Sequence, residues 1–235
     1  IRLKVPLEGR VEYNDLVRGK SIFDLSLIED QILIKSDGYP TYHFANVVDD
    51  HFMEISHVMR AEEWLSSLPR HVQLYRALGW DMPEFAHLPI ILAEDRSKLS
   101  KRHGATAVHT YRSRGYLPDA MVNFLALLGW SLDDKTERIS RSNLIKNFSI
   151  DRVGKSGAIF NSDKLDWMNG TYIREMDIED LADNLLGYWQ EYSVDLIPDT
   201  PDREYLLRIV PLIQERIKTL ADAADLISFF FREKL

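Results

Sequence analysis

The sequence contains no cysteine among its 235 residues. Disulfide bonds and thiolate metal sites are therefore excluded, and we expect a cytoplasmic protein. No apolar run is long enough to cross a bilayer, so we expect no membrane-spanning helix and no membrane partner. Internal repeats and low-complexity segments are also absent. The remaining class is an ordinary globular protein, with enough residues for a packed core.

The chain has no overall excess of positive charge, since its formal net charge is −8. This balance argues against a general nucleic-acid-binding protein, which is normally basic. One stretch departs from it: Arg96 to Arg114 contains lysines and arginines but no acidic residue. A basic stretch on an acidic chain predicts a nucleic acid that touches one defined face.

The first part of the chain alternates between predicted strands and helices. Pro69 lies in the first turn of one predicted helix and Gly79 at its end, which is the usual arrangement of these residues. The strand–helix–strand order predicts βαβ units and a parallel sheet. We predict strands at 1–5, 10–13, 21–24, 31–36, 54–59 and 85–92, and helices at 42–53 and 68–78.

After Gly104 the pattern becomes almost entirely helical. Ser140 is a plausible N-cap for one of these helices. The chain is thus predicted to be α/β followed by all-α. The predicted helices are 117–128, 140–148, 162–170, 178–192, 202–215 and 220–231, and a polar loop is predicted at 151–159.

A lysine-rich segment, Lys98–Arg102, follows the apolar run Leu88–Leu92. Lysine carries a compact charge on a flexible stem, which suits a phosphate that moves during a reaction. The segment therefore predicts a phosphate-binding loop. The alternative is a solvated surface loop.

A second set of polar residues surrounds Arg60. Tyr42, Asn46 and Asp50 are spaced by four residues and therefore share one helix face. Open α/β sheets bind ligands at the carboxyl ends of their strands, where Arg60 is expected to lie. An arginine there can hold a carboxylate in a bidentate manner. The alternative is a surface ion pair between Arg60 and Glu62 or Glu63.

Four segments, taken together, resemble bacterial-type glutamyl-tRNA synthetase. They occur in one colinear order and span essentially the whole chain: Ser36–His51, Val58–Trp64, Lys98–Arg102 and Trp167–Arg174. The lysine segment corresponds to the Lys-Met-Ser-Lys-Ser signature of class I synthetases. Their other signature, His-Ile-Gly-His, does not occur here.

The resemblance implies a fragment of a longer protein. It places the C-terminal half of a Rossmann catalytic domain at 1–104, with the end of an acceptor-binding insertion at 1–30. A stem-contact module follows at 105–175, and the first helical anticodon-binding module at 176–235. Half of the ATP pocket is absent from such a fragment, so we expect the fragment alone to be inactive.

The resemblance also implies a reaction and its residues. The family activates L-glutamate with ATP and Mg²⁺ and transfers it to the 3′ end of tRNA(Glu). The amino acid would contact Tyr42, Asn46 and Arg60, with Glu63 lining the same pocket. We expect a monomer and no protein-bound metal. The residues implied in catalysis are Lys98, Ser100 and Lys101, and those implied in ATP binding are Lys98, Lys101, Arg102, Trp64 and Ile91.

Three alternatives remain beside the glutamate ligase. One is a tRNA-binding fragment without catalysis. Another is a shorter paralogue that attaches glutamate to a modified tRNA base, although the helical stretch 177–231 disfavours it. The third is a glutaminyl-tRNA synthetase, whose anticodon domains are β-barrels rather than helices.

Overall fold

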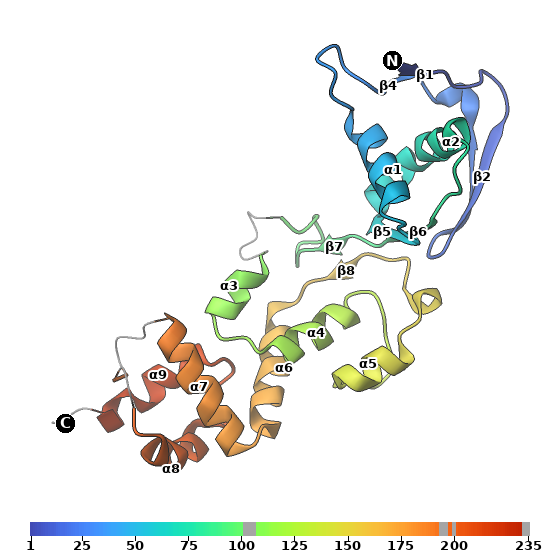
Figure 1. Cartoon of the computed structure of the whole chain (residues 1–235). Helices are drawn as coiled ribbons and strands as arrows, with labels where there is room; N and C mark the ends of the chain where they lie inside the picture. The colour runs from blue at the N-terminus through green and yellow to red at the C-terminus, as the bar shows by residue number, and fades with distance from the viewer. Residues whose placement is uncertain (101–106, 193–196, 199–200, 232–235) are drawn as a thin grey trace. The chain divides into compact units, whose positions relative to one another are not determined.

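The computed structural model describes residues 1–100, 107–192, 197–198 and 201–231 (Figure 1). The chain forms two compact units. The first unit combines Ile1–Ile90 with Ser149–Ala158, and the second combines Ile91–Phe148 with Ile159–Leu235. Each unit is described separately.

The first unit begins with two antiparallel strand pairs. Strands β1 (Arg2–Leu3) and β4 (Gln31–Ile32) form one pair. Strands β2 (Arg10–Asp15) and β3 (Gly19–Asp24) form a hairpin. Gly19 adopts φ +77° next to its turn, a conformation that suits glycine. The β character predicted for this region is confirmed.

A parallel βαβ unit forms the rest of this unit's framework. Strand β5 (His57–Ala61) leads through a 3₁₀ helix, η2 (Glu62–Ser67), into α2 (Leu68–Leu78), and β6 (Glu84–Leu88) returns parallel to β5. Gly79 ends α2 in the left-handed conformation, as predicted. Helix α1 (Tyr42–Phe52) packs on α2. The core below these elements includes Val11, Val47, Leu68, Val72, Tyr75 and Phe85.

All six predicted strands differ in extent from the observed ones, and two of the differences have a clear physical cause. The segment 85–92 is not one strand, since β6 ends at Leu88 and a separate β7 covers Ile91–Leu92. Pro89 interrupts the ladder because it has no N–H to donate. Strand β5 begins at His57 rather than at Glu54, which adopts φ +54° and turns the chain after α1.

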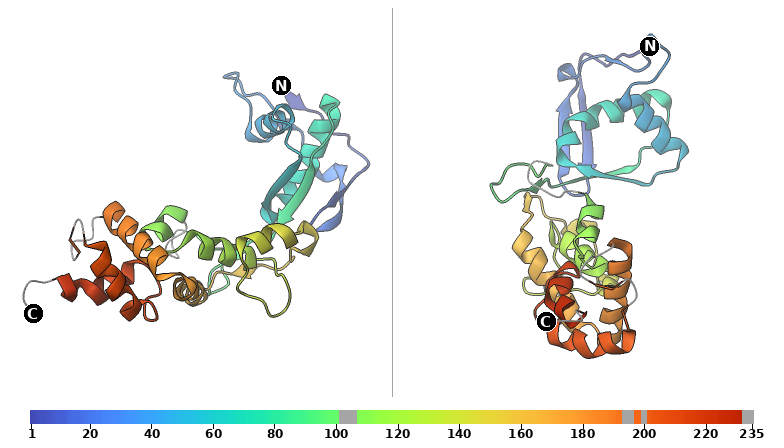
Figure 2. Two further views of the ribbon diagram at one scale, coloured as in Figure 1. Left: turned by 60° about the horizontal axis from the view of Figure 1, so that its bottom comes forward. Right: turned by 90° about the vertical axis from the view of Figure 1, so that its left-hand side faces the viewer.

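The second unit is mainly helical (Figure 2). The Ser140 side chain accepts a hydrogen bond from the Asn143 N–H at 3.3 Å, which confirms its predicted role as an N-cap. The larger of its two hydrophobic clusters includes Ile173, Leu181, Leu185, Leu206, Val210 and Ile227. The helices are α3 (Val108–Ser113), α4 (Pro118–Leu127), α5 (Arg141–Asn147), α6 (Ser162–Glu175), α7 (Ile178–Tyr192), α8 (Arg203–Ile213) and α9 (Ala221–Ile227).

Several of these boundaries depart from the prediction. Helix α3 was not predicted, since six residues give too little apolar periodicity. Helix α6 continues past Gly170 to Glu175, and Gly170 lies inside it against the backbone of residues 217–218. Helix α9 gives way to a 3₁₀ segment, η5 (Ser228–Phe231). The predicted loop contains a 3₁₀ turn, η4 (Ile150–Arg152), and a short strand, β8 (Ala158–Ile159). In the described part of the chain, no helix has the length and apolar character needed to span a bilayer.

Candidate functional site

The Arg60 guanidinium points into the first unit. Arg60 pairs with His87 in the parallel β5–β6 register, and its Nε donates to His87 Nε2 at 3.0 Å. Its Nη1 lies 3.1 Å from His71 Nδ1 on α2. The alternative of a surface pair does not describe this geometry, and Glu62 forms an ion pair with Arg18 instead. Arg60 is thus fixed by two imidazoles.

The third nitrogen of the guanidinium, Nη2, is buried and has no hydrogen-bond partner among the described residues. The same is true of Asn46 Oδ1 and the Tyr75 hydroxyl. Buried polar atoms are nearly always hydrogen-bonded, so such atoms point to a missing partner. A guanidinium N–H is a donor, and the acceptor that suits it best is a carboxylate.

The predicted helix face of α1 does meet Arg60. The Tyr42 ring lies 5.3 Å from the Trp64 ring, and Arg60 Cζ lies 6.0 Å from the centroid of the Trp64 ring. Burial lowers the pKa of Arg60, while the negative charge of Asp50 opposes that shift. Burial raises the pKa of Asp50, and Arg60 partly offsets this. The structure therefore brings Tyr42, Trp64 and Arg60 together, with Asn46 one turn further along α1.

Sequence reasoning missed three buried residues behind Arg60: Asp15, His71 and His87. The Asp15 and His87 side chains are fully buried, and His87 Nδ1 lies 2.5 Å from Asp15 Oδ2. Burial alone would raise the pKa of Asp15. Hydrogen bonds from His87 and from the backbone N–H groups of Arg18 and Val17 outweigh it and lower the pKa to about 2. The sequence signal that could have revealed this cluster is His87, a histidine inside the apolar strand β6.

The lysine segment belongs to the second unit and starts in a tight hairpin. Ala93 N–H donates to the Ser97 carbonyl at 2.8 Å, and Arg96 turns the chain with φ +62°. Leu99 N–H donates to the Ile91 carbonyl at 2.9 Å, so Ile91 lies beside the start of the lysine segment. Lys98 is exposed. The hairpin thus presents Lys98 and Ser100, while Lys101 and Arg102 lie outside the described residues.

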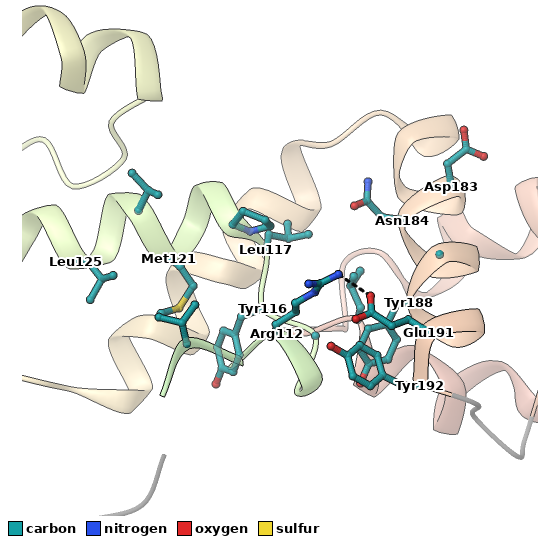
Figure 3. Close-up of a pocket in the computed structure, with 16 residues that line it drawn as sticks. Arg112, Tyr116, Leu117, Met121, Leu125, Asp183, Asn184, Tyr188, Glu191 and Tyr192 are labelled. Carbon is teal, nitrogen blue, oxygen red and sulfur yellow. Dashed lines mark hydrogen bonds and ion pairs between the residues drawn. The ribbon is translucent and has the colours of Figure 1, made fainter. Parts of the chain in front are cut away.

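A separate pocket of about 680 Å³ lies in the second unit between α3, α4 and α7 (Figure 3). Arg112 and Glu191 form an ion pair of 2.8 Å across it, so one arginine of the predicted basic stretch is neutralised by an acid. The Tyr188 hydroxyl donates to the Ser113 carbonyl at 2.7 Å. Tyr188 and Tyr192 line this pocket, whereas Trp189 is buried in the core.

The described residues contain no group of three or more His, Asp or Glu side chains arranged to hold a metal ion. His43 hydrogen-bonds through Nδ1 to His71 Nε2 at 2.9 Å. His51 stacks on the Trp80 ring at 3.9 Å. Both histidines are therefore engaged with other side chains.

Comparison with known proteins identifies the class of protein to which this chain belongs. Residues 1–167 match the catalytic domain of class I tRNA synthetases (E and Q), and residues 180–235 match an anticodon-binding domain. The parallel βαβ framework and the helical C-terminal part are thus those of a class I tRNA synthetase.

Individual relatives narrow this class. The chain is 52% identical to a glutamate–tRNA ligase of Dehalococcoides mccartyi and 47% identical to that of Moorella thermoacetica, covering 100% and 99% of this chain. A crystal structure of a glutamate tRNA ligase from Elizabethkingia meningosepticum, in complex with its amino acid, superposes with a TM-score of 0.84 at 40% identity over 97% of this chain. The chain belongs to the class I tRNA synthetases (E and Q), and these relatives are glutamate–tRNA ligases. It spans about half the length of these relatives, 49%, 48% and 48% respectively.

Proposed function

We propose that this chain is part of a glutamate–tRNA ligase and forms the pocket for the side-chain carboxylate of glutamate. The observation that carries the proposal is the buried Arg60 Nη2, which has no hydrogen-bond partner within the described part of the chain. A bound carboxylate would supply the missing acceptor. Tyr42 and Asn46 on the adjoining helix face would complete this contact surface. The names of the relatives support the same substrate.

This pocket would reject glutamine for a physical reason. A neutral amide cannot compensate a buried guanidinium, so binding glutamine would leave the charge of Arg60 unpaired. The amide oxygen could accept from Nη2, but it carries no negative charge to offset that of the guanidinium. Selection would therefore depend on charge rather than on size, because glutamate and glutamine have nearly the same shape.

The proposed reaction has two steps. The α-carboxylate oxygen of glutamate attacks the α-phosphorus of ATP, the bond to the bridging oxygen breaks, and pyrophosphate leaves. A hydroxyl of the terminal adenosine of tRNA(Glu) then attacks the carbonyl carbon, its proton is lost, and AMP leaves with the bonding electron pair. The product is an ester of glutamate with the tRNA.

The residues of the lysine segment would act in the first step. Charge builds on the departing pyrophosphate, and fixed positive groups stabilise it. Lys98 and Lys101 would hold this charge, while Ser100 and Arg102 would support the loop. Trp64 and Ile91 would lie near the nucleotide. Mg²⁺ would neutralise phosphate charge and would be held chiefly through the phosphate oxygens.

We further propose the domain limits that the sequence suggested. Residues 1–104 would be the second half of a Rossmann catalytic domain, including the end of an insertion at 1–30. Residues 105–175 would form a stem-contact module and 176–235 a helical anticodon-binding module. The parallel β5–β6 pair supports the first assignment, and the family match over 180–235 supports the last. The protein would work as a monomer in the cytoplasm.

The test compares Arg60→Ala with Lys101→Ala in the longer protein that we propose carries this chain. A hydrogen bond to a charged group contributes about 1.5–3 kcal/mol, so Arg60→Ala should raise KM for glutamate roughly 10- to 100-fold. KM for ATP should change little. Lys101→Ala should instead lower kcat and leave KM for glutamate unchanged. Steady-state tRNA charging measures all of these.

Arg76→Ala is the matched control, since Arg76 is an exposed arginine on α2. It should leave both KM values unchanged. An unchanged KM for glutamate in Arg60→Ala would contradict the carboxylate assignment.

A further inference from the structure

A continuous chain of hydrogen-bonded side chains runs through the first unit with Arg60 at its centre. Each member comes from a different element: β2, β6, β5, α2 and α1. The consecutive distances are 2.5, 3.0, 3.1 and 2.9 Å. In order, the members are Asp15, His87, Arg60, His71 and His43.

The Arg60 guanidinium determines which imidazole nitrogens of this hydrogen-bonded series carry a proton. Arginine has N–H donors and no acceptor, so each imidazole nitrogen that faces Arg60 must be unprotonated. His87 therefore accepts at Nε2 and carries its proton on Nδ1, where it donates to Asp15. His71 accepts at Nδ1 and carries its proton on Nε2, where it donates to His43. Both histidines are neutral, and their tautomers are opposite.

Burial makes the neutral form of His71 the stable one. Desolvation, followed by the charge of Arg60, lowers the pKa of His71 to about 3. Imidazole nitrogens are single acceptors, so they can hold Nε and Nη1 without neutralising the guanidinium. The Asp15 carboxylate is separated from Arg60 by the whole His87 ring, and the Asp50 carboxylate acts on Arg60 without a hydrogen bond to it.

We propose that Asp15, His87 and His71 are positioning residues that orient the Arg60 guanidinium and leave Nη2 as its ligand-facing donor. Asp15 sets the tautomer of His87, and the two imidazoles set the plane of Arg60. The role of Arg60 toward glutamate rests on the proposed function, whereas the tautomers do not depend on it. Selectivity for a carboxylate over an amide would thus depend on residues that never touch the substrate.

Asp15→Asn tests this arrangement with little change of shape. The asparagine oxygen can still accept from the backbone N–H groups of Val17 and Arg18, which now bond to Asp15 Oδ1 at 3.0 and 2.8 Å. The new NH₂ group cannot accept from His87 Nδ1. His87 must then carry its proton on Nε2, facing the Nε–H of Arg60, and the two donors conflict.

Histidine ¹⁵N NMR of the 235-residue chain reads the tautomers directly. We expect Nδ1–H for His87 and Nε2–H for His71 in the unmodified chain, and a switch of His87 to Nε2–H in Asp15→Asn. His57→Gln, which removes an exposed histidine of β5, should leave both signals in place. The opposite tautomer, or a protonated ring, at His87 in the unmodified chain would overturn the proposal whatever the activity.

Kinetics in the longer protein test the consequence. Asp15→Asn should raise KM for glutamate at least tenfold and reduce the glutamate-over-glutamine preference, with kcat and KM for ATP within about threefold. His71→Leu should do the same, whereas His71→Asn, whose oxygen can replace Nδ1 as acceptor, should retain most of the affinity. The comparison of His71→Leu with His71→Asn keeps the proposal testable if Asp15→Asn does not fold.

The outcomes separate the two proposals. If Arg60→Ala raises KM for glutamate but Asp15→Asn and His71→Leu do not, the positioning role is wrong and the proposed function stands. If none of the three raises it, both proposals are wrong. If His71→Asn is as impaired as His71→Leu, the acceptor argument fails.

Discussion

At the scale of single residues, the central feature is a half-buried cation that is held by neutral partners. His71 and His87 supply acceptors to Arg60, and the carboxylate of Asp15 lies one ring further away. A direct Arg60–carboxylate pair would already satisfy the charge that a ligand has to neutralise. Keeping the carboxylate at a distance leaves the guanidinium oriented and its Nη2 unsatisfied.

This arrangement predicts how stability depends on pH. The folded-state pKa of His71 is about 3, below its ordinary value of 6.5, because of burial and the charge of Arg60. Between these values the unfolded chain binds a proton that the folded chain does not. The free energy of unfolding should therefore fall as pH drops below 6.5, by up to about 1.4 kcal/mol per pH unit for one proton.

Urea denaturation of the chain at pH 4.5 to 6.5 measures this slope, and His71→Leu should flatten it. Asp15 does not interfere in this pH range. Its lowered pKa of about 2 contributes stability that is fully present above its ordinary pKa of 3.8, and this contribution is lost as pH falls toward 2. In His71→Leu, the lowered pKa of His43 still gives the free energy of unfolding a smaller pH dependence of the same sign. An unchanged slope in His71→Leu would show that His71 is not held neutral by the fold.

Sequence reasoning found only the ligand-facing half of this cluster. Tyr42 and Arg60 were predicted because helix spacing and strand position are local properties. Asp15 and His87 are 72 residues apart, and their contact depends on how the β2–β3 hairpin packs on β6. The spacing of residues carries no information on such a contact. The roles of Tyr42 and Asn46 stay predictions.

At the scale of elements, the helices of the first unit followed from local signals. Helix α2 spans 68–78 as predicted, because Pro69 and Gly79 mark its two ends. The strands were less predictable, and Pro89 divides what reads in the sequence as one apolar run. In the second unit, α6 extends past Gly170 because tertiary packing overrides the weak helix propensity of glycine.

Gly115 illustrates how tightly the helices of the second unit approach one another. It adopts φ +78°, and its carbonyl accepts a hydrogen bond from the Leu220 N–H at 2.9 Å. A Cβ at this position would lie 2.6 Å from the Ala221 nitrogen and 2.7 Å from the Leu220 nitrogen. The backbone before α9 would have to move to accept any side chain.

Gly115→Ala should therefore destabilise the protein by about 2 kcal/mol or more, through both the positive φ and the backbone clash. Gly187→Ala is the control, because Gly187 lies within α7 and a Cβ there meets nothing within 4 Å. It should be neutral or stabilising by up to about 1 kcal/mol. Thermal or urea unfolding compares the two variants. Equal stability of both would contradict the close approach.

At the scale of the whole molecule, the two units carry different parts of the proposed chemistry. The first unit holds Arg60 and its supporting side chains, and the second presents Lys98 in the hairpin that begins at β7. The mixed α/β and helical character was predictable from the change of pattern after Gly104. The detailed module limits stay a proposal, as does the expectation that these 235 residues alone are inactive.

The most direct test of the central claim is tRNA(Glu) charging by the longer protein that we propose carries this chain, with glutamate, glutamine and aspartate compared side by side. Glutamine lacks the negative charge, and aspartate has it on a side chain one carbon shorter. Selective charging with glutamate, lost in Arg60→Ala, is the predicted result. Equal use of glutamine and glutamate, or no charging while tRNA still binds, would contradict the account.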